Sequence, residues 1–162
     1  MSLFDIFKKK DNKNLPAKTI FCYTEIHMNG DVGDEKEYTV TVTEDGTITT
    51  KIVRFGKKKV KSTSFQFDHI VSLINQVSKE NKDVIESCDG LVSAGCTIQI
   101  NISFENKSIT LDETSYTGEI RNIVGTILRQ IESLNRYYMD PPKNRPARVY
   151  GVPRPNKFDW VF

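Results

Sequence analysis

The side chains best suited to chemistry in this chain are two histidines, His27 and His69, and three cysteines, Cys22, Cys88 and Cys96. A nucleophilic thiol needs an imidazole within hydrogen-bond reach. Side chains alternate along a strand, so Cys22 and His27 should point to opposite faces of the strand that carries both. No local signature joins His69 to either remaining thiol. The sequence therefore predicts no catalytic cysteine.

Metal and phosphate sites are not indicated either. The cysteines are odd in number and lack the CxxC spacing of zinc sites, which also argues against a disulfide framework. Loop acids at 31, 34, 35 and 37 offer oxygen ligands, but they lack the regular alternation and closing glutamate of a calcium loop. The patterns GxGxxG, GxxxxGK[ST], HExxH and GxSxG are absent. We expect no cofactor, no metal and no enzymatic activity.

A basic turn offers a different kind of chemistry. The turn follows Phe55 and contains Lys57, Lys58, Lys59 and Lys61. Lysines neutralise phosphates and flat rings stack on bases, so this pattern is typical of nucleic-acid binding. The lysines also discourage edge-to-edge pairing of the short edge strand expected near Val60.

A second group lies in residues 135–162, which contain five of the six prolines. Proline fixes φ and removes a backbone donor, so this tail should be extended or rich in turns. Tryptophan, tyrosine and arginine dominate interface hot spots. We expect the tail either to bind another chain or to pack on an uncovered face of its own sheet. Its candidate partner-binding residues are Arg148, Tyr150, Arg154, Phe158, Trp160 and Phe162.

The element that should position these groups is a helix over residues 118–134. Its apolar residues recur at steps of three and four and form one broad stripe. Burying each of them stabilises the fold by roughly 1.5 to 3 kcal/mol. The stripe consists of Ile120, Ile123, Val124, Ile127, Leu128, Ile131 and Leu134. A second stripe predicts a helix over residues 68–81, capped near Ser64.

Alternating patterns predict strands over residues 18–28, 38–42 and 48–52, near 60, and over 96–104 and 109–111. Asp45 and Gly46, between two β-branched runs, predict a hairpin. Residues 82–95 are expected to be a polar loop. Two helices that each carry a single apolar stripe can cover only one face of a sheet. The predicted fold is therefore a two-layer α+β sandwich with an antiparallel sheet of about five or six strands, in the order β-β-β-β-α-β-β-α.

Composition is that of one soluble globular domain, with 38% apolar and 27% charged residues. We divide the chain into a short amphipathic, basic segment (1–14), an α+β domain (15–134) and the tail (135–162). The net charge is +2 for residues 1–13, −4 for residues 14–134 and +4 for residues 135–162. The start MSLFDIFKKK has its lysines after the apolar patch, unlike a secretory signal. No run is long enough to cross a membrane, so we expect a cytoplasmic protein.

These features favour a small intracellular, non-enzymatic protein-binding module that neutralises or scaffolds a partner, as immunity-like inhibitors do, with self-association left open. One alternative is a nucleic-acid-binding accessory protein that uses the two basic ends. Another is an enzyme of unknown class. Contact of residues 2–7 with a membrane surface also stays open.

Deletion of residues 145–162 distinguishes the two roles of the tail. If the tail covers its own sheet, the truncated chain should fail to fold. If it binds a partner, the truncated chain should remain folded and lose the complex. Circular dichroism and size-exclusion chromatography measure the two outcomes.

Overall fold

The structure is a computed structural model that describes residues 15–28, 35–55 and 59–139. The described chain folds into six strands and three helices: the six strands and two long helices follow the predicted order, and the short third helix is α2. The elements are β1 (Thr19–His27), β2 (Lys36–Thr43), β3 (Thr47–Arg54), β4 (Lys59–Gln66), α1 (His69–Glu80), α2 (Lys82–Ser87), β5 (Ile98–Phe104), β6 (Lys107–Asp112) and α3 (Gly118–Met139).

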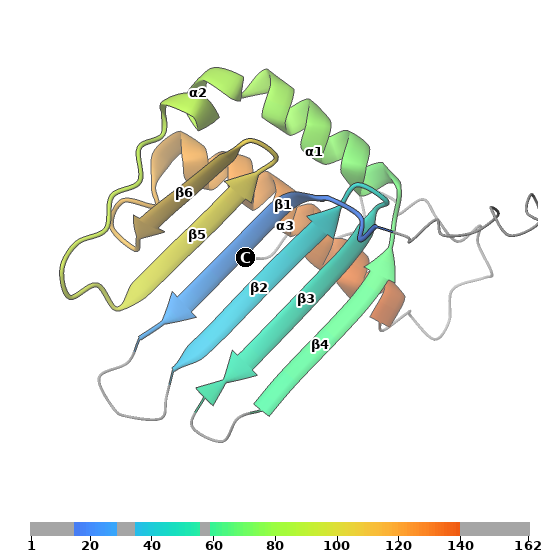
Figure 1. The fold of residues 1–162 in the computed structure, drawn as a ribbon, viewed down its shortest axis with the longest axis horizontal. Coiled ribbons are helices and arrows are strands. Elements are labelled where there is room, and N and C mark those ends of the chain that lie inside the picture. Colours follow the sequence, from blue (N-terminus) through green and yellow to red (C-terminus); the bar gives the residue numbers. More distant parts are fainter. Residues whose placement is uncertain (1–14, 29–34, 56–58, 140–162) are drawn as a thin grey trace, which may run out of the picture.

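The strands form one antiparallel sheet in the order β4-β3-β2-β1-β5-β6. The first strand lies inside the sheet and joins the β2–β4 meander to the β5–β6 hairpin (Figure 1). The long helices α1 and α3 pack on the same face, so the predicted two-layer α+β architecture is confirmed. We call the face that carries the helices the inner face and the opposite one the outer face.

The turn between β2 and β3 forms at the predicted Asp-Gly pair. Gly46 has a φ of 80°, in the left-handed region that favours glycine. The Asp45 carboxylate accepts hydrogen bonds from the Thr47 amide at 3.0 Å and the Thr43 hydroxyl at 2.6 Å. The turn thus fixes the register of this hairpin, in which Val42 lies opposite Ile48.

The core lies between α3 and the inner face. Six of the seven stripe residues of α3 are buried, and Leu128 packs at the edge of the same cluster. The strands contribute Phe21, Val40 and Ile102, each fully enclosed. Ile70 and Ile74 of α1 belong to this cluster as well. One apolar layer therefore joins both long helices to the sheet.

The outer face is mainly polar and carries short side chains. Its hydroxyls pair across neighbouring strands, as between Thr24 and Thr39 at 3.3 Å and between Thr49 and Ser64 at 3.1 Å. It also carries the apolar residues Ile26, Val53 and Val60, of which Val53 is buried. An antiparallel sheet with one polar face can remain in contact with water.

The two sheet edges differ. A segment after α2 runs along β6, where the Asp112 amide donates to the Leu91 carbonyl at 3.1 Å. The segment fits closely because a Cβ on Gly90 would meet the Thr110 carbonyl oxygen at 2.5 Å. At the opposite edge β4 is largely exposed and bears lysines, as predicted for an edge strand.

Three local predictions differ from the structure. Residues 82–87, expected in a loop, form α2, where buried Ile85 and half-buried Val84 pack on the core. Ser64 does not cap α1, because β4 is longer than predicted and includes it; Asp68 is the N-cap residue. Helix α3 continues through residues 135–139, so the start of the tail is helical. No proline precedes Pro141 there, and nothing in 135–139 interrupts a helix.

Replacing Ile127 with alanine should lower the free energy of unfolding by about 2 to 5 kcal/mol, because the side chain is fully buried and its removal leaves a cavity. Thr126→Ala, at an exposed position on the same helix, should change it by less than about 0.5 kcal/mol. Guanidinium unfolding measures both. Equal effects would contradict the assignment of the core.

The Asp112 carboxylate connects the segment along β6 to the turn that precedes α3. It is 1% exposed and accepts hydrogen bonds from the backbone amides of Ser93, Thr114 and Ser115, at 2.7, 3.1 and 2.8 Å. Its hydrogen bonds to the Ser93 and Ser115 groups hold the pKa of Asp112 well below its usual range. Hydrogen bonds that favour a charged carboxylate have this effect.

The lowered pKa predicts acid sensitivity. The folded state binds the Asp112 proton less tightly than the unfolded state, whose pKa is about 3.9. The contribution of Asp112 is therefore complete above that pH and is lost as the pH falls towards the folded-state value. Asp112→Asn should flatten the pH dependence of the unfolding free energy below about pH 4. Asp89→Asn, at an exposed site, is the control, and urea unfolding across this range is the measurement.

Candidate functional site

Four neighbouring strands place a basic or imidazole side chain at the same level. His27 of β1 lies opposite Lys36 of β2, which lies opposite Arg54 of β3, which lies opposite Lys59 of β4. Residues directly opposite one another project from the same face, and neighbouring strands are about 4.8 Å apart. Register therefore brings these four side chains into one row on the inner face.

A second row lies two residues further into each strand. It consists of Glu25, Tyr38, Ile52 and Lys61, which are again directly opposite one another. Tyr38 packs at the edge of the core, whereas Ile52 is half-buried and lies outside the core cluster. We define the basic platform as Lys36, Arg54, Lys59 and Lys61 together with Tyr38 and Ile52.

The platform is open. Arg54, Lys59 and Lys61 are exposed, and Lys36 is half-buried. Among the residues that the structure describes, none of these four cations forms an ion pair. Figure 1 shows that the ends of β1 to β4 that carry the first row extend past the helices α1 and α3. Four positive charges thus lie at a part of the inner face that helices leave uncovered.

A hydrogen-bonded trio borders the platform on β1. The Glu25 carboxylate accepts from the Tyr23 hydroxyl at 2.7 Å and contacts the His27 imidazole. Burial, and then the Glu25 carboxylate, raise the pKa of Tyr23 well above its ordinary value. Burial also raises the pKa of Tyr116 to about 12. A raised phenol pKa disfavours the phenolate, and Tyr23 donates its hydroxyl proton to Glu25 in the neutral form.

Helix α3 forms the opposite border. Burial raises the pKa of Tyr38, and the negative charges of Glu132 and Glu25 raise it further. Glu132 is paired at 2.5 Å with Arg136, one turn along α3. The charges on α3 near the platform therefore partly neutralise one another, and the platform keeps its own positive charge.

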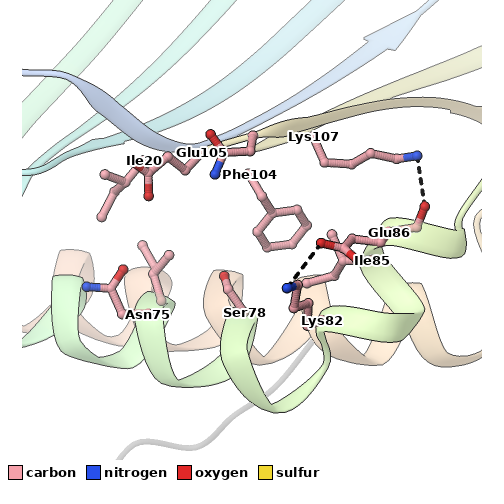
Figure 2. Close-up of a pocket in the computed structure, with 11 residues that line it drawn as sticks. Ile20, Asn75, Ser78, Lys82, Ile85, Glu86, Phe104, Glu105 and Lys107 are labelled. Atoms are coloured by element: carbon pink, nitrogen blue, oxygen red, sulfur yellow. Dashed lines mark hydrogen bonds and ion pairs between the residues drawn. The ribbon is translucent and has the colours of Figure 1, made fainter.

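A separate pocket of about 340 Å³ lies between the helices and the β5–β6 turn. Figure 2 shows Phe104 projecting between the strand layer and α1, with Lys82 and Glu86 of α2 at one side. The Lys82 ammonium lies 3.7 Å from the Glu86 carboxylate, and Lys107 donates to the Glu86 carbonyl at 3.1 Å. The polar groups at the mouth thus interact with one another, and its floor consists of core side chains.

The thiols and imidazoles do not come together. Cys22 lies opposite Thr41 on the outer face, whereas His27 is on the inner face, as the alternation predicted. His69 is exposed at the start of α1, where its ring lies 5.4 Å from that of Phe67. Burial raises the pKa of Cys88, which disfavours its thiolate.

Only part of the predicted binding residues can be placed. Lys59 and Lys61 are on β4 within the platform. Lys57 and Lys58 lie outside the described residues, as do the six tail residues Arg148, Tyr150, Arg154, Phe158, Trp160 and Phe162.

Sequence reasoning missed Lys36, Tyr38, Ile52 and Arg54 as members of a surface. Alternation assigns each of them to a strand face, but only the register across β1 to β4 shows that they are neighbours. Lys36 follows an acidic stretch whose composition predicts a loop, whereas in the structure it begins β2.

The described ranges contain no cluster of three His, Cys, Asp or Glu side chains suited to a metal ion. They also contain no helix with the length and apolar character needed to span a membrane. Comparison with known proteins adds no assignment: no protein-family model matches the chain, and no curated protein is similar to it. The geometry of the basic platform is therefore the basis for a functional proposal.

Proposed function

We propose that this chain is a small intracellular, non-enzymatic module that binds a partner protein through the basic platform. The observation that carries the proposal is the row of Lys36, Arg54 and Lys59, in register on β2, β3 and β4 and without an ion pair among the described residues, next to a half-exposed isoleucine and a tyrosine. Arginine and tyrosine are frequent in interface hot spots. A surface built on paired strands is also rigid, so it loses little conformational entropy when it binds.

The polar outer face supports a role for the tail in binding. Hydroxyls that pair across the strands allow much of this face to remain in contact with water, which supports a tail that binds a partner rather than one that covers the sheet. Under the proposal, the tail residues from Arg148 to Phe162 bind the partner together with the platform. Neutralising or scaffolding that partner is the expected consequence, and a second copy of the chain is one candidate partner.

Nucleic acid is the second candidate ligand, and the same cations favour it. Lysine and arginine neutralise phosphates, and Tyr38 is an aromatic neighbour. The remainder of the domain opposes a polyanion, because residues 14–134 carry a net charge of −4. Binding that depends on phosphates should weaken steeply with salt.

Affinity capture with platform variants tests the proposal. The double variant Arg54→Ala and Lys59→Ala should reduce recovery of the partner by at least about tenfold, because both cations face it. Lys51→Ala is the matched control: Lys51 is exposed on β3 but projects from the outer face. It should retain full recovery.

The captured material should survive nuclease treatment and contain one stoichiometric protein. Recovery that nuclease abolishes would favour the nucleic-acid alternative. Equal recovery by the double variant and the wild type would refute the platform as the binding surface. Thermal unfolding of each variant confirms that it is folded.

A further inference from the structure

The strip of the inner face that carries the two rows, and that α1 and α3 leave uncovered, has the dimensions of one helix. Its two rows are about 6.7 Å apart along each strand, and side chains extend from both of them. A helix with its side chains is about 10 to 12 Å wide. The strip spans four strands, or about 14 Å, which corresponds to about ten residues of helix. Helix α3 borders the strip near Tyr38, whose pKa Glu132 of α3 raises.

The spacing of the cations also fits a helix. Lys36, Arg54 and Lys59 are on three successive strands and span about 9.6 Å at the backbone. Carboxylates at positions i, i+4 and i+7 of a helix share one side and span about 10.5 Å. Three same-side carboxylates of an extended strand span about 13.6 Å, which fits this row less well.

The apolar residues of the platform also fit an amphipathic helix. Ile52 is half-buried, lies outside the core cluster and is flanked by Tyr38 on one side and Lys61 on the other. An amphipathic helix buries its apolar stripe and places charged residues along the border. Base stacking instead needs flat rings, and Tyr38 is the one aromatic member of the platform.

We infer that the basic platform binds an acidic amphipathic helix of the partner protein, which lies across β1 to β4 beside α3 and extends the helix layer. Its apolar stripe packs on Tyr38 and Ile52. Its carboxylates pair with Lys36, Arg54 and Lys59, and Lys61 faces its flank. This inference rests on the proposed protein-binding function and specifies the class of ligand.

The test uses a synthetic helical peptide of about 18 residues with the full-length protein. Glutamates occupy positions i, i+4, i+7 and i+11, and leucines form an adjacent stripe. A control peptide has the same composition but distributes its glutamates around the helix. The patterned peptide should bind at least about tenfold more tightly than the control, because charge alone is the same in both.

Protein variants locate the binding. The double variant Arg54→Glu and Lys59→Glu should weaken binding at least about tenfold, and Lys51→Glu on the outer face should change it less than about twofold. A peptide with lysines in place of the glutamates should recover affinity for the double variant. Methyl NMR should show a shift at Ile52 and none at Ile26, which is on the opposite face of the sheet.

Each contrary result has a defined meaning. Equal binding of the two peptides, no binding of either, or displacement of the patterned peptide by an oligo(dT) strand of similar length overturns the acidic-helix inference. If partner capture still depends on Arg54 and Lys59 in that case, the protein-binding function stands and another ligand class occupies the platform. If capture is also independent of these residues, both proposals fail.

Discussion

The burial of the α3 stripe against the inner face is the contact on which the remaining structure depends. Ile123, Ile127 and Ile131 of α3 are buried in one cluster with the inner-face residues of β1 and β5. A one-residue slip in any central strand would turn its apolar side chains towards the outer face. The requirement to bury this layer therefore specifies the register of the sheet.

The same requirement explains the position of the platform. Helices α1 and α3 cover the part of the sheet where apolar side chains alternate, as in Val40 and Val42 of β2. Beyond Tyr38 the remaining inner position of this strand is Lys36, which is charged. The inner-face side chains change from apolar to polar where the helix layer ends. The covered part of each strand therefore contributes to stability, and the uncovered part is exposed to ligands. Local charge at such a surface can be positive although the domain as a whole is mildly acidic.

Much of this fold could be predicted from periodicity. The α3 stripe, the hairpin at Asp45 and Gly46, and the single helix-covered face follow from local patterns that tertiary structure retains. Helix α2 could not be recognised in this way, because six residues contain too few turns to show a period. Its stability depends on contacts of Ile85 with a core assembled from distant segments.

The candidate site was less accessible to prediction for a related reason. Lys59 and Lys61 were visible as a lysine-rich stretch, but their neighbours Lys36 and Arg54 come from other strands. Which residues meet across a sheet depends on register and strand order, and both are properties of the folded chain. The remaining predicted binding residues are in the tail, outside the described residues.

The internal position of β1 has a consequence for biosynthesis. Of the six described strands this one leaves the ribosome before the others, and β2 to β4 can join it in sequence on one side as they emerge. Its other side must wait for β5, which begins only at Ile98, after both α1 and α2 have been made. Domains fold during translation as their segments become available. The nascent chain therefore passes through a stage in which β1, one of the two central strands, presents an unpaired edge. Such an edge recruits foreign strands, and chaperone protection would be most valuable during that interval.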